Sequence, residues 1–375
     1  MRYDPPMITE VRLQNFKSFG TLQAAPLEAI TVLVGANNSG KSNFLSFVDV
    51  VRGEGGVSAS DFHRPATGDG SLRVEWDACV RLSPAEAQPR KASWTLRAQP
   101  AGGWTERVAV DGAEALKNVW PGKPGSADID GTMLSPERSL AAYAVTRRHE
   151  SKSMHAVRQL ILPALSARVV HLSVTSLRQR SFTQQSVDLA EDGSNLAAVV
   201  AGWRMEFPER MAQFDEIIQK CLPEMSQVLA QPAENGQVRL LFKQRDGERF
   251  DSPQVSDGVL VFAGLVAHAL SAPEGALVLI EEPERGIHPR RLADFVDLLR
   301  TLVRERRTQF IMASHSPALL NLFRDEPDSV LLLHRAADGT KIRRLSDAED
   351  LAESLSRADP GELLANGAFN EAANF

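Results

Sequence analysis

The chain has 375 residues, of which 43% are hydrophobic and 24% charged, and its formal net charge is −6. These values are typical of a globular protein with one large or two ordinary domains, and the negative charge argues against a protein that coats nucleic acid with its whole surface. The two cysteines, Cys79 and Cys221, are far apart in the sequence, which excludes a disulfide framework and a CxxC zinc site and fits a reducing cytoplasm. No signal peptide is visible, and the longest apolar run, residues 259–270, is too short to cross a bilayer. We therefore expect a cytoplasmic protein that does not enter a membrane.

The N-terminal part predicts two strands, a glycine-rich loop and a helix. Residues 8–13 alternate apolar and polar side chains, as a half-buried strand does, and residues 15–20 resemble a turn. Residues 30–34 form a β-branched run that predicts a buried strand, and apolar side chains recur at helical spacing over residues 44–51. Between them lies the sequence GANNSGKS, residues 35–42, which fits the P-loop pattern G-x-x-x-x-G-K-[ST]. Strand, glycine loop and helix in this order are the context that a P-loop requires.

The P-loop predicts a nucleotide site because each residue type has a role at phosphate. Glycines let backbone N–H groups approach phosphate oxygens where a helix begins, and this favours anions. Lys41 can reach the β- and γ-phosphates, and the hydroxyl of Ser42 can ligate Mg²⁺. A glycine turn with no ligand would not need lysine and serine at these two positions. The predicted ATP-binding residues are Asn37, Asn38, Ser39, Gly40, Lys41 and Ser42.

The middle of the chain predicts a β region and then a mainly helical lobe. Between residues 135 and 182, eight Arg or Lys stand against two Glu, a local charge of +6 that extends from Arg138 to Arg180. This stretch is interpreted as a contact for DNA or an acidic partner, with a solvated helical face as the alternative. The predicted elements are strands at residues 72–76, 93–97 and 238–242, a Gly- and Pro-rich loop at 101–131, and helices over 139–229 with Met225 and Val228 on one apolar helical face.

The last part predicts apolar strands that alternate with helices, a pattern typical of a parallel sheet covered on both faces. Glu281 and Glu282 end one such strand, and His315 follows the next. Because ligands bind at the carboxyl edge of a parallel sheet, one carboxylate can hold Mg²⁺ through water, the next can orient an attacking water, and the imidazole can donate to a γ-phosphate. Two solvated acids that open a loop are the alternative. The predicted elements are a helix over 259–270 with Ser256 as its N-cap, a strand at 277–280, a helix over 292–303, a strand at 310–313 and a hairpin over 330–345.

Together these motifs resemble the RecF-like branch of the ATP-binding-cassette (ABC) ATPases, which includes SMC and Rad50 heads and the ATPase part of overcoming-lysogenization-defect (OLD) nucleases. Two weaker segments are similar to small RecF-like AAA proteins of bacterial defence operons. The resemblance is carried by residues 13–19, 35–42, 256–258, 280–284, 286–289 and 314–317, and the weaker segments are residues 176–178 and 192–196.

The resemblance implies an ATP- and Mg²⁺-dependent homodimer in which two heads enclose the nucleotide. Ser256 and Gly258 of one subunit would then contact the γ-phosphate that Lys41 of the other subunit holds. Glu282 would be the catalytic glutamate and His315 the switch histidine.

Further implications concern the metal and the contacts across the dimer. Residues 286–288 would be the D-loop. Glu281 stands where the family usually carries an aspartate as its metal ligand, and Gln179 and Gln184 are the only guesses for a Q-loop glutamine.

The fold class that we predict is an α/β P-loop NTPase with an ABC-ATPase head and an inserted helical lobe. No coiled-coil heptads or zinc hook are visible, and only 59 residues follow Ser316, so we expect any nuclease or effector on a separate chain. The predicted function is an ATP-driven switch that acts in bacterial defence with a separately encoded partner. The alternatives are a slow scaffold that holds an effector inactive, a RecF-like DNA repair ATPase and a P-loop kinase. The predicted parts are residues 1–135 (first half of the head), 136–235 (helical lobe), 236–345 (second half of the head) and 346–375 (acidic tail).

Overall fold

The computed structural model describes residues 8–52, 59–64, 70–80, 89–100, 103–120, 127–129, 132–134, 159–164, 166–182 and 188–371. The chain divides into two compact units, the first made of Met1–Ala167, Gly275–Leu277 and Gln309–Phe375, and the second of Arg168–Glu274 and Val278–Thr308. The domain boundaries predicted at residues 135, 235 and 345 stay predictions. No helix in the described part of the chain is long and apolar enough to cross a membrane.

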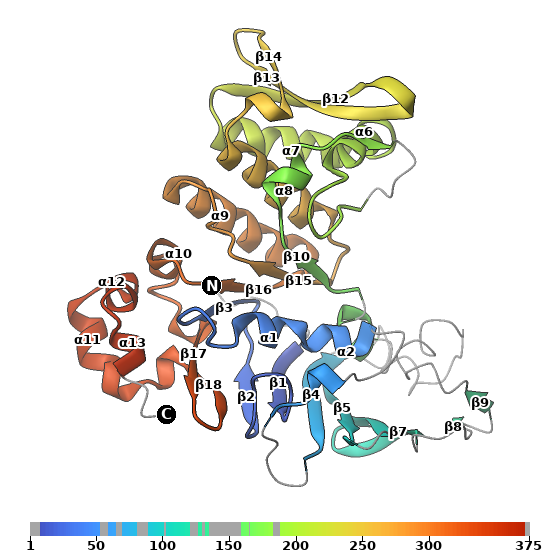
Figure 1. The fold of residues 1–375 in the computed structure, drawn as a ribbon, viewed down its shortest axis with the longest axis vertical. Helices are drawn as coiled ribbons and strands as arrows, with labels where there is room; N and C mark the ends of the chain where they lie inside the picture. Colours follow the sequence, from blue (N-terminus) through green and yellow to red (C-terminus); the bar gives the residue numbers. More distant parts are fainter. Residues whose placement is uncertain are drawn as a thin grey trace. The chain divides into compact units, whose positions relative to one another are not determined.

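The first unit contains an antiparallel sheet with the strand order β2-β1-β4-β5-β6-β7, of which Figure 1 labels all strands but β6. The predicted strand at residues 8–13 is confirmed as β1, with Ile8, Val11 and Leu13 fully buried. A short ribbon, β8-β9, follows the sheet along the chain. The strands are β1 (Ile8–Gln14), β2 (Gln23–Pro26), β4 (Leu72–Val80), β5 (Arg90–Ala98), β6 (Trp104–Val110), β7 (Ala113–Trp120), β8 (Ala127–Ile129) and β9 (Thr132–Leu134).

The loop predicted over residues 101–131 is wrong, because β6 and β7 occupy most of it. The two strands are joined through Asp111 and Gly112, which both have positive φ angles, 50° and 80°. A two-residue turn of this kind matches the twist of antiparallel strands and favours Asp-Gly. The glycine content of the segment therefore marks a hairpin, not an open loop.

The same unit holds parallel strands in the order β16-β3-β17, with β18 antiparallel on β17. The strands β3 and β16 are buried at every residue, as predicted for the apolar runs. The hairpin predicted over 330–345 is confirmed by β17 and β18. The elements are β3 (Ile30–Val34), α1 (Lys41–Leu45), α2 (Asp49–Arg52), β16 (Gln309–Ser314), α10 (Pro317–Asn321), β17 (Val330–Ala336), β18 (Gly339–Arg344), α11 (Ala352–Arg357), α12 (Pro360–Ala365) and α13 (Ala368–Glu371).

Aromatic side chains connect the first helix to the antiparallel sheet. Phe44 of α1 lies 5.8 Å from Phe47, which contacts Trp76 of β4 at 6.1 Å between ring centroids. Trp76 stacks on Trp94 of β5 at 4.1 Å. All four rings are fully buried, so the helix that follows the glycine loop is anchored by edge-to-face and stacked aromatic contacts.

In its described residues, the second unit combines two parallel strands, four long helices and a small antiparallel sheet. β10 pairs with β15, and β11-β13-β12 form the second sheet, with β14 on β13. The helices α6 and α7 pack on this sheet (Figure 1), and α8 is buried from Val259 to Ser271. The elements are β10 (Arg168–Val170), α5 (Val174–Leu177), β11 (Ser181–Phe182), α6 (Leu196–Glu206), α7 (Pro208–Cys221), β12 (Met225–Pro232), β13 (Gln237–Gln244), β14 (Arg249–Asp251), α8 (Asp257–Ser271), β15 (Leu277–Glu281) and α9 (Pro289–Arg306).

One helical face in this unit was predicted too long. Met225 and Val228 do not continue the apolar face of α7, because this helix ends at Cys221 and both residues lie in β12. Pro223 lies at this boundary, and the residue before a proline is disfavoured in a helix, so the chain leaves the helix here. Both side chains are still buried, which explains why their apolar character matched a helical pattern.

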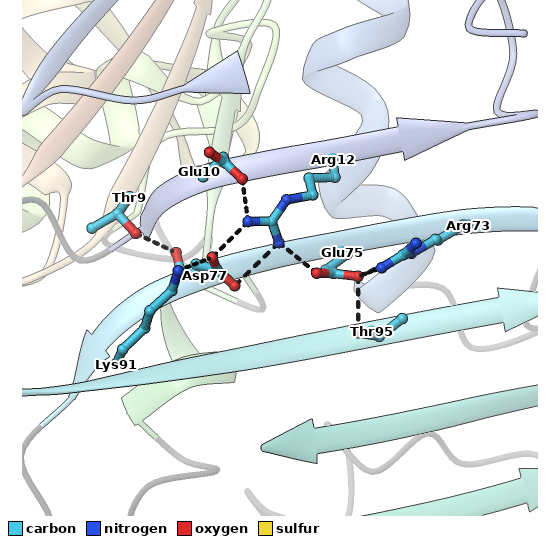
Figure 2. A network of polar contacts seen from close by, with 8 residues as sticks. All are labelled: Thr9, Glu10, Arg12, Arg73, Glu75, Asp77, Lys91 and Thr95. Carbon is cyan, nitrogen blue, oxygen red and sulfur yellow. Dashed lines mark hydrogen bonds and ion pairs between the residues drawn. The ribbon is translucent and has the colours of Figure 1, made fainter. Parts of the chain in front are cut away.

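A network of charges covers part of the antiparallel sheet of the first unit (Figure 2). Arg12 of β1 pairs with Asp77 of β4 at 2.8 Å, and Lys91 of β5 pairs with the same carboxylate at 2.9 Å. Asp77 is only 3% exposed. Burial alone would raise the pKa of Asp77, but the hydrogen bonds and charges of Arg12 and Lys91 outweigh it and hold this pKa below its ordinary value. Further members of the network are Thr9, Glu10, Arg73, Glu75 and Thr95.

This network predicts a pH-dependent contribution to stability. Because the folded-state pKa of Asp77 is lowered, its ionised form stabilises the folded chain above pH of about 4, and this stabilisation is lost as the pH falls through the folded-state pKa. Asp77→Asn should lower the free energy of unfolding at pH 7 by about 1.5–3 kcal/mol, and the difference from the wild type should shrink toward pH 3. Urea unfolding across this range measures it. Asp325→Asn, at a side chain that is 94% exposed, is the control, and a difference for Asp77→Asn that does not change with pH would contradict the assignment.

Candidate functional site

The glycine-rich loop leaves a buried strand and leads into α1. Lys41 begins this helix, and its Nζ donates to the backbone oxygens of Gly35 at 2.6 Å and Ala36 at 2.9 Å. The ammonium therefore lies across the loop, within reach of any anion that the loop would hold. Asn37, Asn38 and Ser42 are exposed, so their side chains are accessible to a ligand.

The loop has a strained but well-supported backbone. Asn38 has a φ angle of 65° and Gly40 one of 107°, and Phe44 N–H donates to the Gly40 oxygen at 2.8 Å. Ser39 is buried, and within the described part of the chain its Oγ has no hydrogen-bond partner. The positive φ angles of Asn38 and Gly40 thus turn the chain sharply just before α1 begins.

His315 reaches the same edge of the sheet as the loop. β16 and β3 are parallel, and Ser314 is in register with Val34. The next residues, His315 and Gly35, therefore leave neighbouring strands side by side. His315 is exposed, and the helix behind it is capped by Ser316, whose Oγ accepts from Leu319 N–H at 3.3 Å. The structure brings the predicted switch histidine beside the start of the P-loop.

In the second unit, Glu281 is the last residue of β15 and Glu282 follows it, so both lie at the carboxyl edge of the β10–β15 pair. Val170 is in register with Ile280, so His171 follows β10 next to Glu281. The Nδ1 atom of His171 lies 2.7 Å from Oε2 of Glu281, and it is the donor because a carboxylate accepts. Sequence reasoning missed His171. The signal that could have found it is the short β-branched run before it, which ends like the other buried strands.

Glu282 adopts a conformation that is unusual for a side-chain-bearing residue. Its φ angle is 46°, and its backbone oxygen accepts from Arg285 N–H at 2.9 Å in the turn that follows. Non-glycine residues in this region carry backbone strain of order 1–3 kcal/mol, and such strain is concentrated at functional sites. The turn holds the half-buried Glu282 side chain at the mouth of a cavity.

This cavity has a volume of about 460 Å³ and lies wholly within the second unit. Asp257 and Gly286 of the predicted D-loop both line it, and the start of α8 approaches the D-loop closely, since a Cβ on Gly258 would lie only 2.5 Å from the Gly286 oxygen. Ser256 has the predicted N-cap position, but its exposed side chain makes no capping hydrogen bond. The cavity is lined by residues 170–175, Asp257, Val261, Leu265, Glu281, Glu282, Arg285 and Gly286.

Arg178 fixes the segment that enters α8. Its guanidinium donates to Asp257 Oδ1 at 2.6 Å and to the backbone oxygens of Pro253 at 2.7 Å and Val255 at 3.3 Å. In return, Ser252 Oγ donates to the Arg178 oxygen at 3.2 Å. The planar guanidinium of Arg178 thus binds one carboxylate and several backbone carbonyls, and these contacts hold the start of α8 in one position.

The predicted site residues are divided between the two units. The P-loop and His315 belong to the first, and Glu281, Glu282, Ser256 and Gly258 belong to the second. Within the described residues, no group of three or more His, Cys, Asp or Glu could hold a metal ion.

Two further predictions lie partly outside the described residues. The backbone of Gln179 closes a turn with Ser176, while Gln184 lies outside the described residues. Most of the basic stretch also lies outside them, and two of its described members make ion pairs within the chain. These are Arg168 with Asp188 at 2.7 Å and Arg178 with Asp257.

Comparisons with known proteins agree with this geometry. A family model described as "AAA domain, putative AbiEii toxin, Type IV TA system" matches residues 131–321, which include both glutamates and His315 and begin after the P-loop. No curated protein matches the chain.

Three solved SMC heads have a similar fold. One is an SMC head bound to the C-winged helix domain of ScpA (16% identity, TM-score 0.58, 92% of this chain and 100% of that chain). A second, with an extended coiled coil, is bound to the C-terminal domain of ScpA derived from Pyrococcus furiosus (14%, 0.55, 94% and 100%). The third is the SMC head domain from Thermotoga maritima (13%, 0.51, 90% and 98%). The predicted fold class, a P-loop head of the ABC-ATPase type, is confirmed.

The contacts of Arg178 predict a local effect on α8. Arg178→Ala should speed hydrogen exchange at the Val259 and Leu260 amides at least about tenfold, because charge-assisted bonds that hold the preceding segment are lost. Mass spectrometry of exchange measures it. Arg239→Ala removes a similar pair, with Asp251 at 2.7 Å, and is the matched control. Equal exchange in the two variants would show that Arg178 does not hold α8.

Proposed function

The chain belongs to the AAA-domain family whose model matches it, and from this premise we propose that it binds ATP, pairs head to head with a second copy and hydrolyses the nucleotide. The observation that carries the proposal is the P-loop, where Lys41 Nζ lies across the loop at 2.6 Å from the Gly35 oxygen. A phosphate would replace these carbonyl contacts with stronger, charge-assisted ones. The fold of an ATPase head supports the same reading.

The proposed reaction is ATP + H₂O → ADP + phosphate. Lys41 and the N–H groups of the loop bind the β- and γ-phosphates, and Asn37, Asn38, Ser39 and Gly40 shape the loop around them. Glu282 orients a water for attack at the γ-phosphorus and takes a proton from it as the bond to the β-phosphate oxygen breaks. His315 donates to the γ-phosphate.

The residues suited to Mg²⁺ are Ser42 and Glu281, a hydroxyl and a carboxylate of the kind that this ion prefers. Bound Mg²⁺ would neutralise charge on the phosphates. Ser256 and Gly258 complete the site from the second copy, and the exposure of Ser256 supports this role.

Within the ABC ATPases we place the chain in the RecF-like and OLD-like branch, on the motifs described above. The family description names a toxin of a type IV toxin–antitoxin system, and this favours bacterial defence, with a separately encoded nuclease or effector, over DNA repair. One solved SMC head binds the C-winged helix domain of ScpA, which supports a protein partner for this head as well. A slow scaffold that holds an effector inactive is the second candidate, and the turnover rate separates it from the switch.

Lys41 provides the test of nucleotide binding. Lys41→Ala removes a charge-assisted contact worth about 1.5–3 kcal/mol, and ATP binding should become undetectable by calorimetry. Lys220→Ala, at an exposed lysine of α7, is the control and should bind as the wild type does. Unchanged affinity in Lys41→Ala would refute the P-loop assignment.

Glu282 provides the test of hydrolysis and pairing. Glu282→Gln keeps the shape of the side chain but cannot accept the proton, so turnover should fall by at least about 100-fold while ATP still binds. Dimers should then accumulate in size-exclusion chromatography with ATP and Mg²⁺. Glu274→Gln, at an exposed glutamate, is the control. Turnover at the wild-type rate in Glu282→Gln would place the general base elsewhere.

A further inference from the structure

The P-loop is held from outside by a residue that lies 300 positions further along the chain. Thr340, near the tip of the β17–β18 hairpin, is fully buried, and its Oγ1 lies 3.0 Å from the Ser39 oxygen. The same Oγ1 lies 2.8 Å from Ser18 Oγ, and Thr340 N–H donates to the Ser18 oxygen at 2.7 Å. The hairpin therefore contacts the loop and the turn at residues 15–20 at once.

The direction of these hydrogen bonds follows from what each group can do. A carbonyl oxygen only accepts, so the single hydroxyl proton of Thr340 goes to Ser39. The Ser18 hydroxyl must then donate to Thr340. Because both serine residues are nearly buried, the chain of bonds is shielded from water and stays directed.

The glycines of the loop fit closely against the hairpin. A Cβ on Gly40 would lie 2.4 Å from Thr340 Oγ1 and 2.7 Å from Ser18 Oγ. A Cβ on Gly35 would lie 2.2 Å from the Leu333 oxygen of β17. Both glycines of the motif thus let the hairpin approach the loop, in addition to any contact with phosphate.

We propose that Thr340 is a positioning residue for the nucleotide, which acts through the peptide between Ser39 and Gly40. This peptide is planar and trans, so its N–H points away from the direction of its C=O. Since the Ser39 oxygen is bound to Thr340, the Gly40 N–H is turned to the opposite side, where the loop would hold phosphate. Thr340 itself does not contact the nucleotide. It orients the Gly40 N–H, which would donate to a phosphate oxygen.

The inference rests on the proposed ATP site, and a matched set of variants tests it. Thr340→Val keeps the shape but removes the hydroxyl, and ATP affinity measured by calorimetry should weaken about tenfold. Thr340→Ser keeps the hydroxyl and should restore affinity to within about twofold of the wild type. Thr31→Val is the control, because Thr31 of β3 is also fully buried, and its Oγ1 accepts from Glu28 N–H at 2.9 Å away from the loop.

The pattern across these variants separates positioning from loss of stability. Thr340→Val and Thr31→Val each remove one buried hydroxyl, so a merely structural role would weaken ATP binding in both or in neither. Equal affinity in the two variants would overturn the proposal. If Thr340→Val does not fold, Ser18→Ala removes the supporting hydroxyl without changing the hairpin and should also weaken binding.

A measurement without nucleotide keeps the inference independent of the proposed function. Hydrogen exchange over residues 37–44 should be faster in Thr340→Val than in Thr31→Val or the wild type, because the loop loses its anchor. If the wild type binds no ATP, the proposed function is wrong, and this exchange result alone decides whether Thr340 holds the loop. Unchanged exchange would overturn the proposal.

Discussion

The burial of whole strands is the constraint on which the candidate site depends. β3 and β16 have no exposed residue, and β15 is buried up to Ile280. Strands of this kind carry polar side chains inside only where a hydrogen bond satisfies them, as at Thr31 and Gln309, so polar groups that could face a ligand lie where the strands end. Their parallel registers then decide which polar groups become neighbours, and they place Gly35 beside His315 and His171 beside Glu281.

Glycines in this protein serve packing as much as conformation. Gly40 needs a positive φ angle, but it also lies where a Cβ would meet two hydroxyl groups. Gly258 has an ordinary φ angle, and the Gly286 oxygen occupies the space that a Cβ on Gly258 would need. Gly40 therefore meets a demand of packing, the close approach of another part of the chain, besides its conformational one.

Much of the fold could be predicted from the sequence, because local signals and burial agreed there. The apolar runs at β3, β15 and β16 were long enough to identify as buried strands, and the spacing over 292–303 identified α9. The prediction of secondary structure failed where a short sequence signal fitted more than one kind of element. Asp111-Gly112 was hidden in a glycine-rich segment, and Met225 continued a helical pattern by chance.

The site was predictable only in part, because the motifs name residues but not their supports. Lys41, Glu282 and His315 came from patterns that a chain can be searched for. His171 and Thr340 make contacts with residues 110 or more positions away, at sequences with no special pattern. Arg178 lies in one of the weaker resembling segments, but its contacts with a segment 74 or more positions away were not predicted. Such partners depend on strand register and on the path of the chain, which local propensity does not determine.

The backbone at Glu282 sets stability against activity at a single position. Glycine or asparagine would adopt its φ angle of 46° at a lower cost in free energy. Substitution of Glu282 by either residue would stabilise the fold and would remove the carboxylate. Selection of this protein for thermal tolerance alone would therefore favour loss of the carboxylate at this position. If Glu282 has the proposed role, the more stable chains would hydrolyse ATP more slowly.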